Sequence, residues 1–175
     1  MTFYRHAMRR FDRPFLERKK DNLIILWADE AQKVVTASED GMSDYNAVDV
    51  IREAKATVVA ATQSFLSLVP PMENENKIKI FVSNMGNRII FKAADEESAK
   101  IAADTVGKKE VKKYTHNTSK KNQSRSFSFE EKYCVAPHEF RSFKKFEAVI
   151  CHCEKGWKRG KLKPIGADGK APSWY

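Results

Sequence analysis

Two unbroken apolar runs stand early in the chain, at residues 23–28 (LIILWA) and 58–61 (VVAA). Short apolar runs without polar alternation are typical of strands buried on both faces, as in a parallel sheet. Between them, residues 44–55 repeat apolar residues at helical spacing, which predicts a helix with one buried face. The order strand, helix, strand predicts an α/β fold.

Two further helices have recognisable boundaries. Apolar residues recur at helical spacing over residues 3–11, directly before Pro14. Later in the chain, Asp95 is a typical N-cap and Gly107 a typical helix stop, with alanines at helical spacing between them. Both segments are therefore expected to form helices that pack through one apolar face.

Beyond residue 107 the chain becomes more polar and more basic. We expect a strand at residues 88–92, an edge strand at 124–129, a helix at 138–146, a strand at 148–152 and a basic tail at 155–175. Residues 78–82 fit either a helix or a strand. No internal repeat is visible.

The length and charge fit a single basic domain of 175 residues with a net charge of +9. This excess of Lys and Arg favours a polyanionic partner, either nucleic acid or an anionic membrane surface. No apolar run approaches the roughly 20 residues that a membrane-spanning helix needs. The N-terminus lacks the pattern of a secretory signal, and three cysteines do not make a disulfide framework, so we expect a cytoplasmic protein.

The first apolar run ends in Asp29 and Glu30. Four or more apolar residues followed by Asp-Glu describe a Walker B strand, which places two carboxylates at the edge where open α/β sheets bind ligands. Asp29 would then help to hold Mg²⁺ through its water shell, and Glu30 would orient the attacking water. The alternative is a buried strand followed by a helix that begins with two acidic residues, which its dipole favours.

The second apolar run also ends in polar residues, Thr62, Gln63 and Ser64. The amide of Gln63 suits contact with phosphate and water because it can donate and accept at once, and Thr62 would lie beside the nucleotide. An ordinary polar strand end is the alternative for each position. Two such ends separated by a helix of suitable length favour a shared site.

Arg52 lies on the expected helix between the two runs. One interpretation is an arginine finger that reaches the nucleotide of a neighbouring subunit. The other is a solvated arginine paired with Glu53 or another neighbour. The first requires an oligomer, which the sequence does not show.

With these motifs in place, the chain resembles the C-terminal part of type IV secretion coupling proteins, the TraG/TraD conjugation ATPases, in the region called the TraM recognition domain. The resemblance rests on residues 26–32 (LWADEAQ), 52–54 (REA), 58–64 (VVAATQS), 84–91 (NMGNRIIF) and 95–99 (DEESA). It covers residues 3–107 well and 124–137 loosely.

The resemblance implies a partial RecA-like P-loop fold, a mostly parallel sheet flanked by helices, over the whole chain. It also implies a hexameric, DNA-associated ATPase at the cytoplasmic face of the inner membrane. Such a motor recruits the relaxosome, through the relaxase and a TraM-like accessory protein, and delivers substrate to the secretion channel. Asp29, Glu30, Gln63 and Arg52 match its Walker B, sensor and finger positions, and ATP and Mg²⁺ are the implied cofactors.

One departure limits the activity that we expect. The phosphate-binding pattern G-x-x-x-x-G-K-[ST] is absent from the sequence, as are the family's N-terminal transmembrane helices. Without that cradle of backbone N–H groups the triphosphate has no pre-formed anion site. We therefore expect no ATP or Mg²⁺ binding and negligible hydrolysis by this chain alone, which would be a truncated product, a split subunit or a piece of a motor.

Other families share parts of this pattern. Residues 29–32 (DEAQ) are similar to the DEAQ/DEAH boxes of superfamily 2 helicases, but residues 61–64 (ATQS) suit hexameric translocases better than the Ser-Ala-Thr motif of those helicases. FtsK- or HerA-like motors have the same core. The rival function is a non-catalytic nucleic-acid- or protein-binding adaptor derived from such a motor.

Two further groups of residues carry candidate chemistry. Cys151, His152 and Cys153 could suggest zinc, but on a strand the cysteines and the histidine point to opposite faces, so core-facing thiols are favoured. Basic residues that could contact DNA phosphates are Lys108, Lys109, Lys112, Lys113, Lys120, Lys121 and Arg125, with Tyr114, His116 and Phe127 for stacking. A solvated loop and strand edge protected by lysines is an equal alternative. The same two interpretations apply to Trp157, Lys158, Arg159, Lys161 and Lys163.

Overall fold

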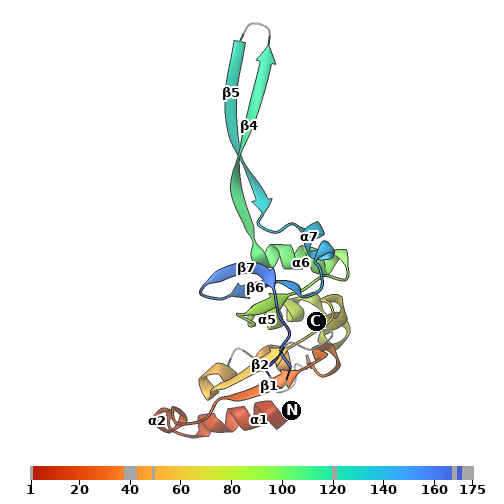
Figure 1. Cartoon of the computed structure of the whole chain (residues 1–175). Helices are drawn as coiled ribbons and strands as arrows, with labels where there is room; N and C mark the ends of the chain where they lie inside the picture. Colours follow the sequence, from red (N-terminus) through yellow and green to blue (C-terminus); the bar gives the residue numbers. More distant parts are fainter. Residues whose placement is uncertain (1, 38–42, 49, 120–121, 167–168, 171–175) are drawn as a thin grey trace. The chain divides into compact units, whose positions relative to one another are not determined.

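The structure is a computed structural model that describes residues 2–37, 43–48, 50–119, 122–166 and 169–170 (Figure 1). The chain forms two compact units, a first unit of Met1–Gly86 and a second unit of Asn87–Tyr175. The sequence pattern changes texture at residue 107, whereas the structural division follows Gly86. Each unit has its own buried core, and each is described here by itself.

The first unit is built on a parallel pair of strands, β1 (Ile24–Ala28) and β2 (Ala56–Ala60). Leu26 lies opposite Val58 in the register. The helical elements of the unit are α1 (Thr2–Met8), η1 (Arg9–Asp12), α2 (Phe15–Arg18), η2 (Ala31–Lys33), α3 (Asp44–Ala47), η3 (Ile51–Ala54), η4 (Leu66–Leu68), α4 (Val69–Met72) and α5 (Glu75–Ser83). The predicted strand–helix–strand order is therefore present.

The helix expected over residues 44–55 is divided into α3 and η3. Its predicted apolar face is nevertheless buried, since Ala47, Ile51 and Ala54 are at most 2% exposed. The β-branched residues Val48 and Val50 lie between the two pieces and disfavour a continuous helix. The segment still acts as the connection between the two parallel strands.

The prediction that both strands are buried on both faces is wrong in this unit. Alternate residues of β1 and β2 pack into the core, but Ile25, Trp27 and Val59 on the other face are 46%, 74% and 38% exposed. The two core clusters of the unit involve the face that carries Ile24, Ala28 and their partners on β2. Apolar residues on the other face explain why the sequence shows unbroken runs.

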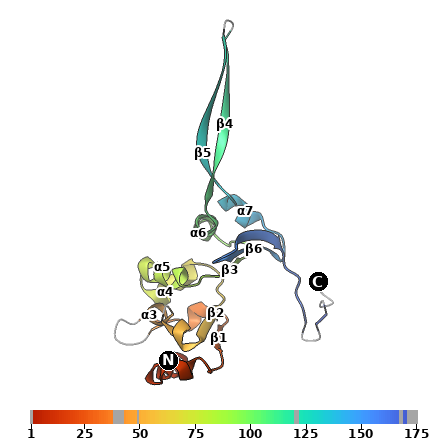
Figure 2. The same cartoon turned by 90° about the vertical axis from the view of Figure 1, so that its left-hand side faces the viewer.

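The second unit contains a three-stranded antiparallel sheet in the order β3 (Arg88–Ile90), β6 (Glu147–His152) and β7 (Gly156–Lys161). Two helices, α6 (Glu96–Val106) and α7 (Pro137–Ser142), pack together in its core. A separate antiparallel hairpin is formed by β4 (Lys108–Ser119) and β5 (Asn122–Tyr133), which Figure 2 shows as a long two-stranded ribbon.

The expectation of a mostly parallel sheet needs correction, because β1–β2 is the single parallel pair among the described residues. Short connections explain two of the three antiparallel pairs, β4–β5 and β6–β7, whereas β3 and β6 pair although they lie far apart in the sequence. Strands joined by a few residues form hairpins, and hairpin partners run antiparallel. The turn between β6 and β7 is tight, with Gly156 at a φ of 73° that favours glycine. The wider assignment to an α/β fold is confirmed.

The helix predicted between Asp95 and Gly107 is confirmed as α6. The Asp95 side chain accepts a hydrogen bond from the Ser98 backbone N–H at 2.7 Å, as an N-cap does. Gly107 ends the helix with a φ of 91°. Ala99, Ala102 and Ala103 are almost fully buried and form part of the core that contains Phe140. Small residues on this face let the helix approach its partners closely.

Candidate functional site

The segments that follow β1 and β2 are held side by side by backbone hydrogen bonds. Ala61 N donates to the Ala28 carbonyl at 2.9 Å, and Ala31 N donates to the Ala61 carbonyl at 2.7 Å. The ladder of the parallel pair thus continues past the last strand residues. The polar residues that follow each strand are therefore neighbours at the carboxyl edge of the sheet.

Glu30 and Gln63 meet directly at this edge. Gln63 Nε2 donates to Glu30 Oε1 at 2.7 Å, and Lys33 Nζ lies 2.5 Å from Glu30 Oε2. The hydrogen bond from Lys33 lowers the pKa of Glu30 below its ordinary value, and the bond from Gln63 lowers it further. The carboxylate is consequently held in its ionised form, the form that can accept a proton or orient a water.

The backbone of Glu30 directs its side chain toward the second strand end. Its φ of 49° and ψ of 54° lie in the left-handed region, which is uncommon for a residue other than glycine. Lys33 N then donates to the Glu30 carbonyl at 2.8 Å, so the chain turns at once into η2. A backbone conformation of this kind costs energy and persists only where the surrounding structure maintains it. Such positions are often found at functional sites.

We expect substitution of Lys33 by methionine to raise the pKa of Glu30 toward its ordinary value, because the largest cause of its depression is removed. Gln63→Leu should raise it less. The pKa follows from NMR titration of the Glu30 side-chain carboxyl carbon. Lys79→Met is a matched control, since Lys79 is paired with Glu75 at 3.6 Å. An unchanged Glu30 pKa in Lys33→Met would show that this pair does not form in solution.

Asp29 lies next to this pair but faces a different space. Its Oδ1 accepts from Glu30 N at 3.0 Å, and its side chain is exposed. It contributes to the lining of a pocket of about 400 Å³, together with Trp27, Tyr4 and Phe81 among others. The structure therefore brings Glu30 and Gln63 into contact and leaves the Asp29 carboxylate open beside them.

The residues fit a nucleotide-bound magnesium better than a metal held by protein alone. No group of three or more His, Cys, Asp or Glu side chains suited to a metal occurs among the described residues. Mg²⁺ keeps several of its waters and takes substrate phosphates as ligands, so one or two carboxylates are enough. An exposed Asp29 meets that requirement.

The Thr62 hydroxyl is already hydrogen-bonded to neighbouring residues of the first unit. Its Oγ1 lies 3.0 Å from Gln32 Oε1, 3.2 Å from the Ser64 carbonyl and 2.9 Å from Ser67 Oγ. The hydroxyl therefore links the turn after β2 to η2. A direct role at a nucleotide would require the hydroxyl to exchange one of these contacts.

Arg52 is not brought to the same edge. It is exposed on η3, which precedes β2, whereas Glu30 and Gln63 follow the strands. Arg52 thus lies at the opposite end of the parallel pair from Glu30. Its side chain cannot serve the same edge of its own chain, and the finger interpretation continues to require a neighbouring subunit.

The Cys-His-Cys sequence is structural in the described part of the chain. Cys151 on β6 is half-buried beside the second unit's core, and this burial raises the pKa of its thiol. Cys153 is exposed, so the prediction of core-facing thiols is wrong for this residue, which lies just beyond the strand. His152 Nδ1 accepts from Glu154 N at 3.1 Å and from Lys155 N at 3.3 Å, which shapes the turn to β7.

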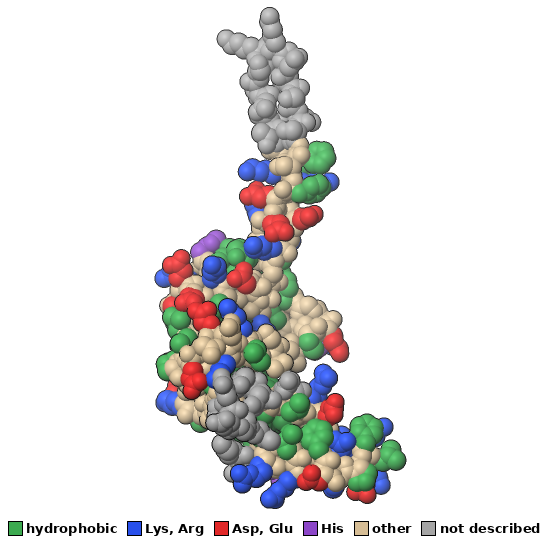
Figure 3. Space-filling model, turned by 180° about the vertical axis from the view of Figure 1, so that it is seen from behind, with side chains coloured by type: hydrophobic (Ala, Val, Ile, Leu, Met, Phe, Trp, Pro, Cys, Tyr) green, Lys and Arg blue, Asp and Glu red, His purple; other side chains and the backbone are tan. Residues whose placement is uncertain are grey.

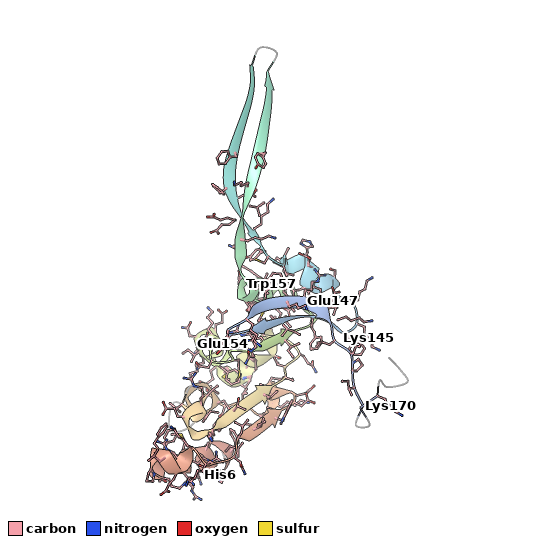
Figure 4. The ribbon with its side chains drawn as sticks, turned by 60° about the vertical axis from the view of Figure 1, so that its left-hand side comes forward. His6, Lys145, Glu147, Glu154, Trp157 and Lys170 are labelled. Atoms are coloured by element: carbon pink, nitrogen blue, oxygen red, sulfur yellow. The ribbon has the colours of Figure 1, made fainter. Side chains whose placement is uncertain are left out.

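The basic tail begins as strand β7, which the sequence did not predict. Arg159 is bound by two carboxylates, with its guanidinium 2.6 Å from Glu139 and 2.8 Å from Glu147, and it lies over the Phe143 ring at 4.6 Å. Figure 4 labels Glu147 and Trp157 on this sheet. These contacts favour a structural role for Arg159.

The basic stretch from residue 108 is part of the β4–β5 hairpin. Lys108, Lys109, Lys112 and Lys113 lie on β4, and Lys112 and Lys113 are exposed. Lys120 and Lys121 lie outside the described residues, and only the backbone is described at Arg125 and His116. No helix in the described ranges is long and apolar enough to span a membrane.

The sequence analysis did not identify two residues that shape the candidate site, Lys33 and Asp44. Lys33 shapes the ionisation of Glu30, and their spacing of three residues was a visible signal. Asp44 is buried and accepts from the Tyr4 hydroxyl at 2.5 Å, from Thr36 N at 2.7 Å and from Thr36 Oγ1 at 2.9 Å. These three residues border the same pocket as Asp29.

Similar folds occur in solved structures of the plasmid coupling protein TrwB. The bacterial conjugative coupling protein TrwB in an unbound monoclinic form has a TM-score of 0.74 at 15% identity, covering 97% of this chain and 38% of that chain. TrwB complexes with the ATP analogue ADPNP and the GTP analogue GDPNP have TM-scores of 0.71 and 0.69, both at 15% identity with 97% of this chain and 37% of that chain covered. The chain thus spans less than two fifths of these proteins.

No curated protein matches the sequence. A family described as the TraM recognition site of TraD and TraG matches residues 25–145. That match covers well over half of the 175 residues and includes both strand ends of the candidate site. The chain therefore belongs to the family of the TraM recognition site of TraD and TraG, in the C-terminal region of conjugative coupling proteins, as the sequence resemblance predicted.

Proposed function

We propose that this chain supplies the hydrolysis edge of a coupling-protein motor in conjugative DNA transfer. The observation that carries the proposal is the hydrogen bond between Gln63 and Glu30 at the carboxyl ends of two parallel strands. A carboxylate and an amide that share one edge can orient a water for attack on a phosphate. The ionised state of Glu30 and the left-handed turn that positions it support the same role.

Nucleotide and Mg²⁺ would be shared with a second segment. The TrwB relatives were solved with ADPNP, with GDPNP, and with ADP and Mg²⁺. In this chain Asp29 would hold the hydrated Mg²⁺, which neutralises charge on the phosphates. The phosphate-binding loop would come from a segment outside these residues, whose sequence lacks that pattern.

The open face of the first unit supports such a partnership. Ile25, Trp27 and Val59 expose apolar surface on one side of the β1–β2 pair. Central strands of α/β sheets are covered on both faces, and their burial contributes about 25 cal/mol per Å² of apolar surface. We propose that the remaining part of the motor covers this face.

We also propose an assembly and a set of partners, on the basis of the family resemblance. A hexamer would let Arg52 reach the nucleotide of the adjacent subunit from the far end of the β1–β2 pair. Docking of relaxosome proteins, the relaxase and a TraM-like accessory protein, and contact with the secretion channel are proposed for the assembled protein. Its place would be the cytoplasmic face of the inner membrane, through a membrane-anchored part.

The test is a transfer assay in the host that encodes this chain. The gene is deleted and complemented with wild type, Glu30→Gln, Gln63→Leu or Glu53→Gln, and protein levels are compared by immunoblot. Glu30→Gln is expected to lower plasmid transfer about 100-fold or more, since a positioned base contributes roughly 10²–10⁴-fold. Glu53→Gln is the matched control, because Glu53 is exposed on η3 away from Glu30.

The outcomes separate the two candidate functions. Normal transfer by Glu30→Gln and Gln63→Leu, with transfer lost on deletion, would contradict the hydrolysis role and favour the non-catalytic adaptor. ATP turnover by the purified chain is a second readout. We expect the purified wild-type chain to hydrolyse ATP no faster than Glu30→Gln does. ATP turnover by the wild type that Glu30→Gln abolishes would show that the chain needs no further segment for hydrolysis.

A further inference from the structure

The β4–β5 hairpin divides its side chains between two different faces. Residues that oppose each other in an antiparallel pair point to the same side, and alternate residues point to opposite sides. Lys112 opposes Phe129, and Tyr114 opposes Phe127, so these four residues form one face, called here the aromatic face. Val111, Lys113, Ser128 and Glu130 form the other, called here the polar face.

The aromatic face presents three large rings that are mostly exposed in the part of the hairpin whose side chains the structure describes. Tyr114, Phe127 and Phe129 are 66%, 63% and 59% exposed. The Phe127 and Phe129 ring centroids are 6.0 Å apart, and Lys112 Nζ lies 5.9 Å and 6.0 Å from them. Figure 3 shows hydrophobic and basic side chains together on the described part of the ribbon. Exposed aromatic rings with a cation beside them are typical of a surface that binds a ligand.

The charged side chains of the hairpin's outer part are all basic. Residues 112–129 (KKYTHNTSKKNQSRSFSF) contain five Lys and Arg and no Asp or Glu. Apart from the aromatic rings, the remaining side chains are hydroxyls, amides and one histidine, and the segment has no glycine or proline. On the polar face Lys113 lies 3.8 Å from Glu130 Oε2, and Lys132 lies 3.6 Å from the same atom. Lysine charge is thus partly neutralised on the polar face. On the aromatic face the acidic pair Glu110 and Glu131 lies two residues along each arm from Lys112 and Phe129, toward the base of the hairpin.

We propose that the aromatic face of the β4–β5 hairpin binds single-stranded nucleic acid. Unpaired bases would stack on Tyr114, Phe127 and Phe129, and Lys112 would contact the phosphates. Stacking on aromatic side chains combined with a basic track is how proteins bind single strands without sequence preference. The proposal does not depend on the nucleotide site proposed above, which lies in the other unit.

The position of the rings argues against two other polyanions. The end of the hairpin reads Ser119, Lys120, Lys121, Asn122, so entry into a membrane tip-first would bury polar residues while the rings remain along the arms. Duplex DNA keeps its bases stacked on each other and would leave three large rings without partners. An extended single strand can lie along the arms and use both the rings and the charge.

The experiment measures binding of the full chain to labelled oligo-dT, oligo-U and a duplex by fluorescence anisotropy. Phe127→Leu/Phe129→Leu is expected to weaken oligo-dT binding about tenfold or more, because stacking is lost while apolar volume stays similar. Phe91→Leu is the control, since Phe91 is an exposed phenylalanine of the same unit outside the hairpin. Circular dichroism checks that each variant keeps its fold.

Two adjacent lysines give the sharper test of the face. Lys112→Ala should weaken binding and reduce the salt dependence of log K by about 0.7, the amount expected for one phosphate contact on a single strand. Lys113→Ala, one residue away on the polar face, should do much less. Equal effects of the two substitutions would overturn the assignment of the aromatic face.

The remaining outcomes also decide the proposal. The proposal is supported if the chain binds oligo-dT, oligo-U or both, and if the double phenylalanine variant loses that binding. Which of the two oligonucleotides binds distinguishes DNA from RNA. Binding to duplex as tight as to oligo-dT, unaffected by the phenylalanine substitutions, would overturn it. The proposal would also be overturned if the chain bound phosphatidylserine vesicles but neither oligonucleotide, and if the double variant lost the vesicle binding.

Discussion

Replacing Phe140 by alanine is expected to lower the free energy of unfolding of the second unit by about 3–5 kcal/mol. Phe140 is 0% exposed, and its ring lies 5.0 Å from that of Phe143. It packs with the buried alanines of α6 and with Val149 of β6, so no neighbour can easily fill the space that it leaves. Guanidinium denaturation followed by circular dichroism measures the loss.

The control for this substitution is Phe129→Ala in the same unit. Phe129 is 59% exposed, so its removal creates no cavity, and we expect a change of at most about 0.5 kcal/mol. Hydrogen exchange of α6 and β6 gives a local readout of the same effect. A loss in Phe140→Ala no larger than in Phe129→Ala would show that this cluster does not form the core of the unit.

Replacing Asp44 by alanine is expected to destabilise the first unit by about 2–3 kcal/mol, because a buried donor without a partner costs about 1–3 kcal/mol. The Tyr4 hydroxyl is the donor concerned, since Tyr4 is 4% exposed and bonds to Asp44 at 2.5 Å. Thr36 loses a partner as well, but its exposure lets water replace it. A double-mutant cycle with Tyr4→Phe isolates the pair, and additive effects would contradict the bond.

The same pair should make stability depend on alkaline pH. Burial raises the pKa of Tyr4 above its ordinary value of 10.0, and the hydrogen bond to Asp44 raises it further. The folded chain therefore keeps a proton that the unfolded chain releases, and the free energy of unfolding falls as the pH rises above about 10. Tyr4→Phe should remove this part of the slope, and an unchanged slope in this variant would contradict the role of the Tyr4 hydroxyl.

The elements that the sequence predicted are those with local signals. The Asp95 cap, the Gly107 stop and the strand ends at Asp29 and Thr62 are all defined by residues within a few positions of each other. Short-range chemistry of this kind does not need the rest of the fold. The placement of Glu30 beside Gln63 followed from the parallel order of two such strands.

The elements that the sequence missed depend on distant partners. Strand β4 is rich in lysine and has no apolar run, and it forms through twelve paired positions with β5. The burial of Asp44 depends on Tyr4, 40 residues away. Exposure of Trp27 depends on what covers the sheet, which no apolar pattern specifies. The role of Lys33 could have been predicted, because it lies three residues after Glu30.

The paired arms of the hairpin restrict how its length can change in evolution. Both arms are registered from Lys108 opposite Tyr133 to Ser119 opposite Asn122. Since side chains alternate with a period of two, loss of a single residue within an arm would turn every ring beyond that point to the opposite side. Homologous hairpins should therefore differ by even numbers of residues within an arm, and odd insertions should collect at the connecting turn.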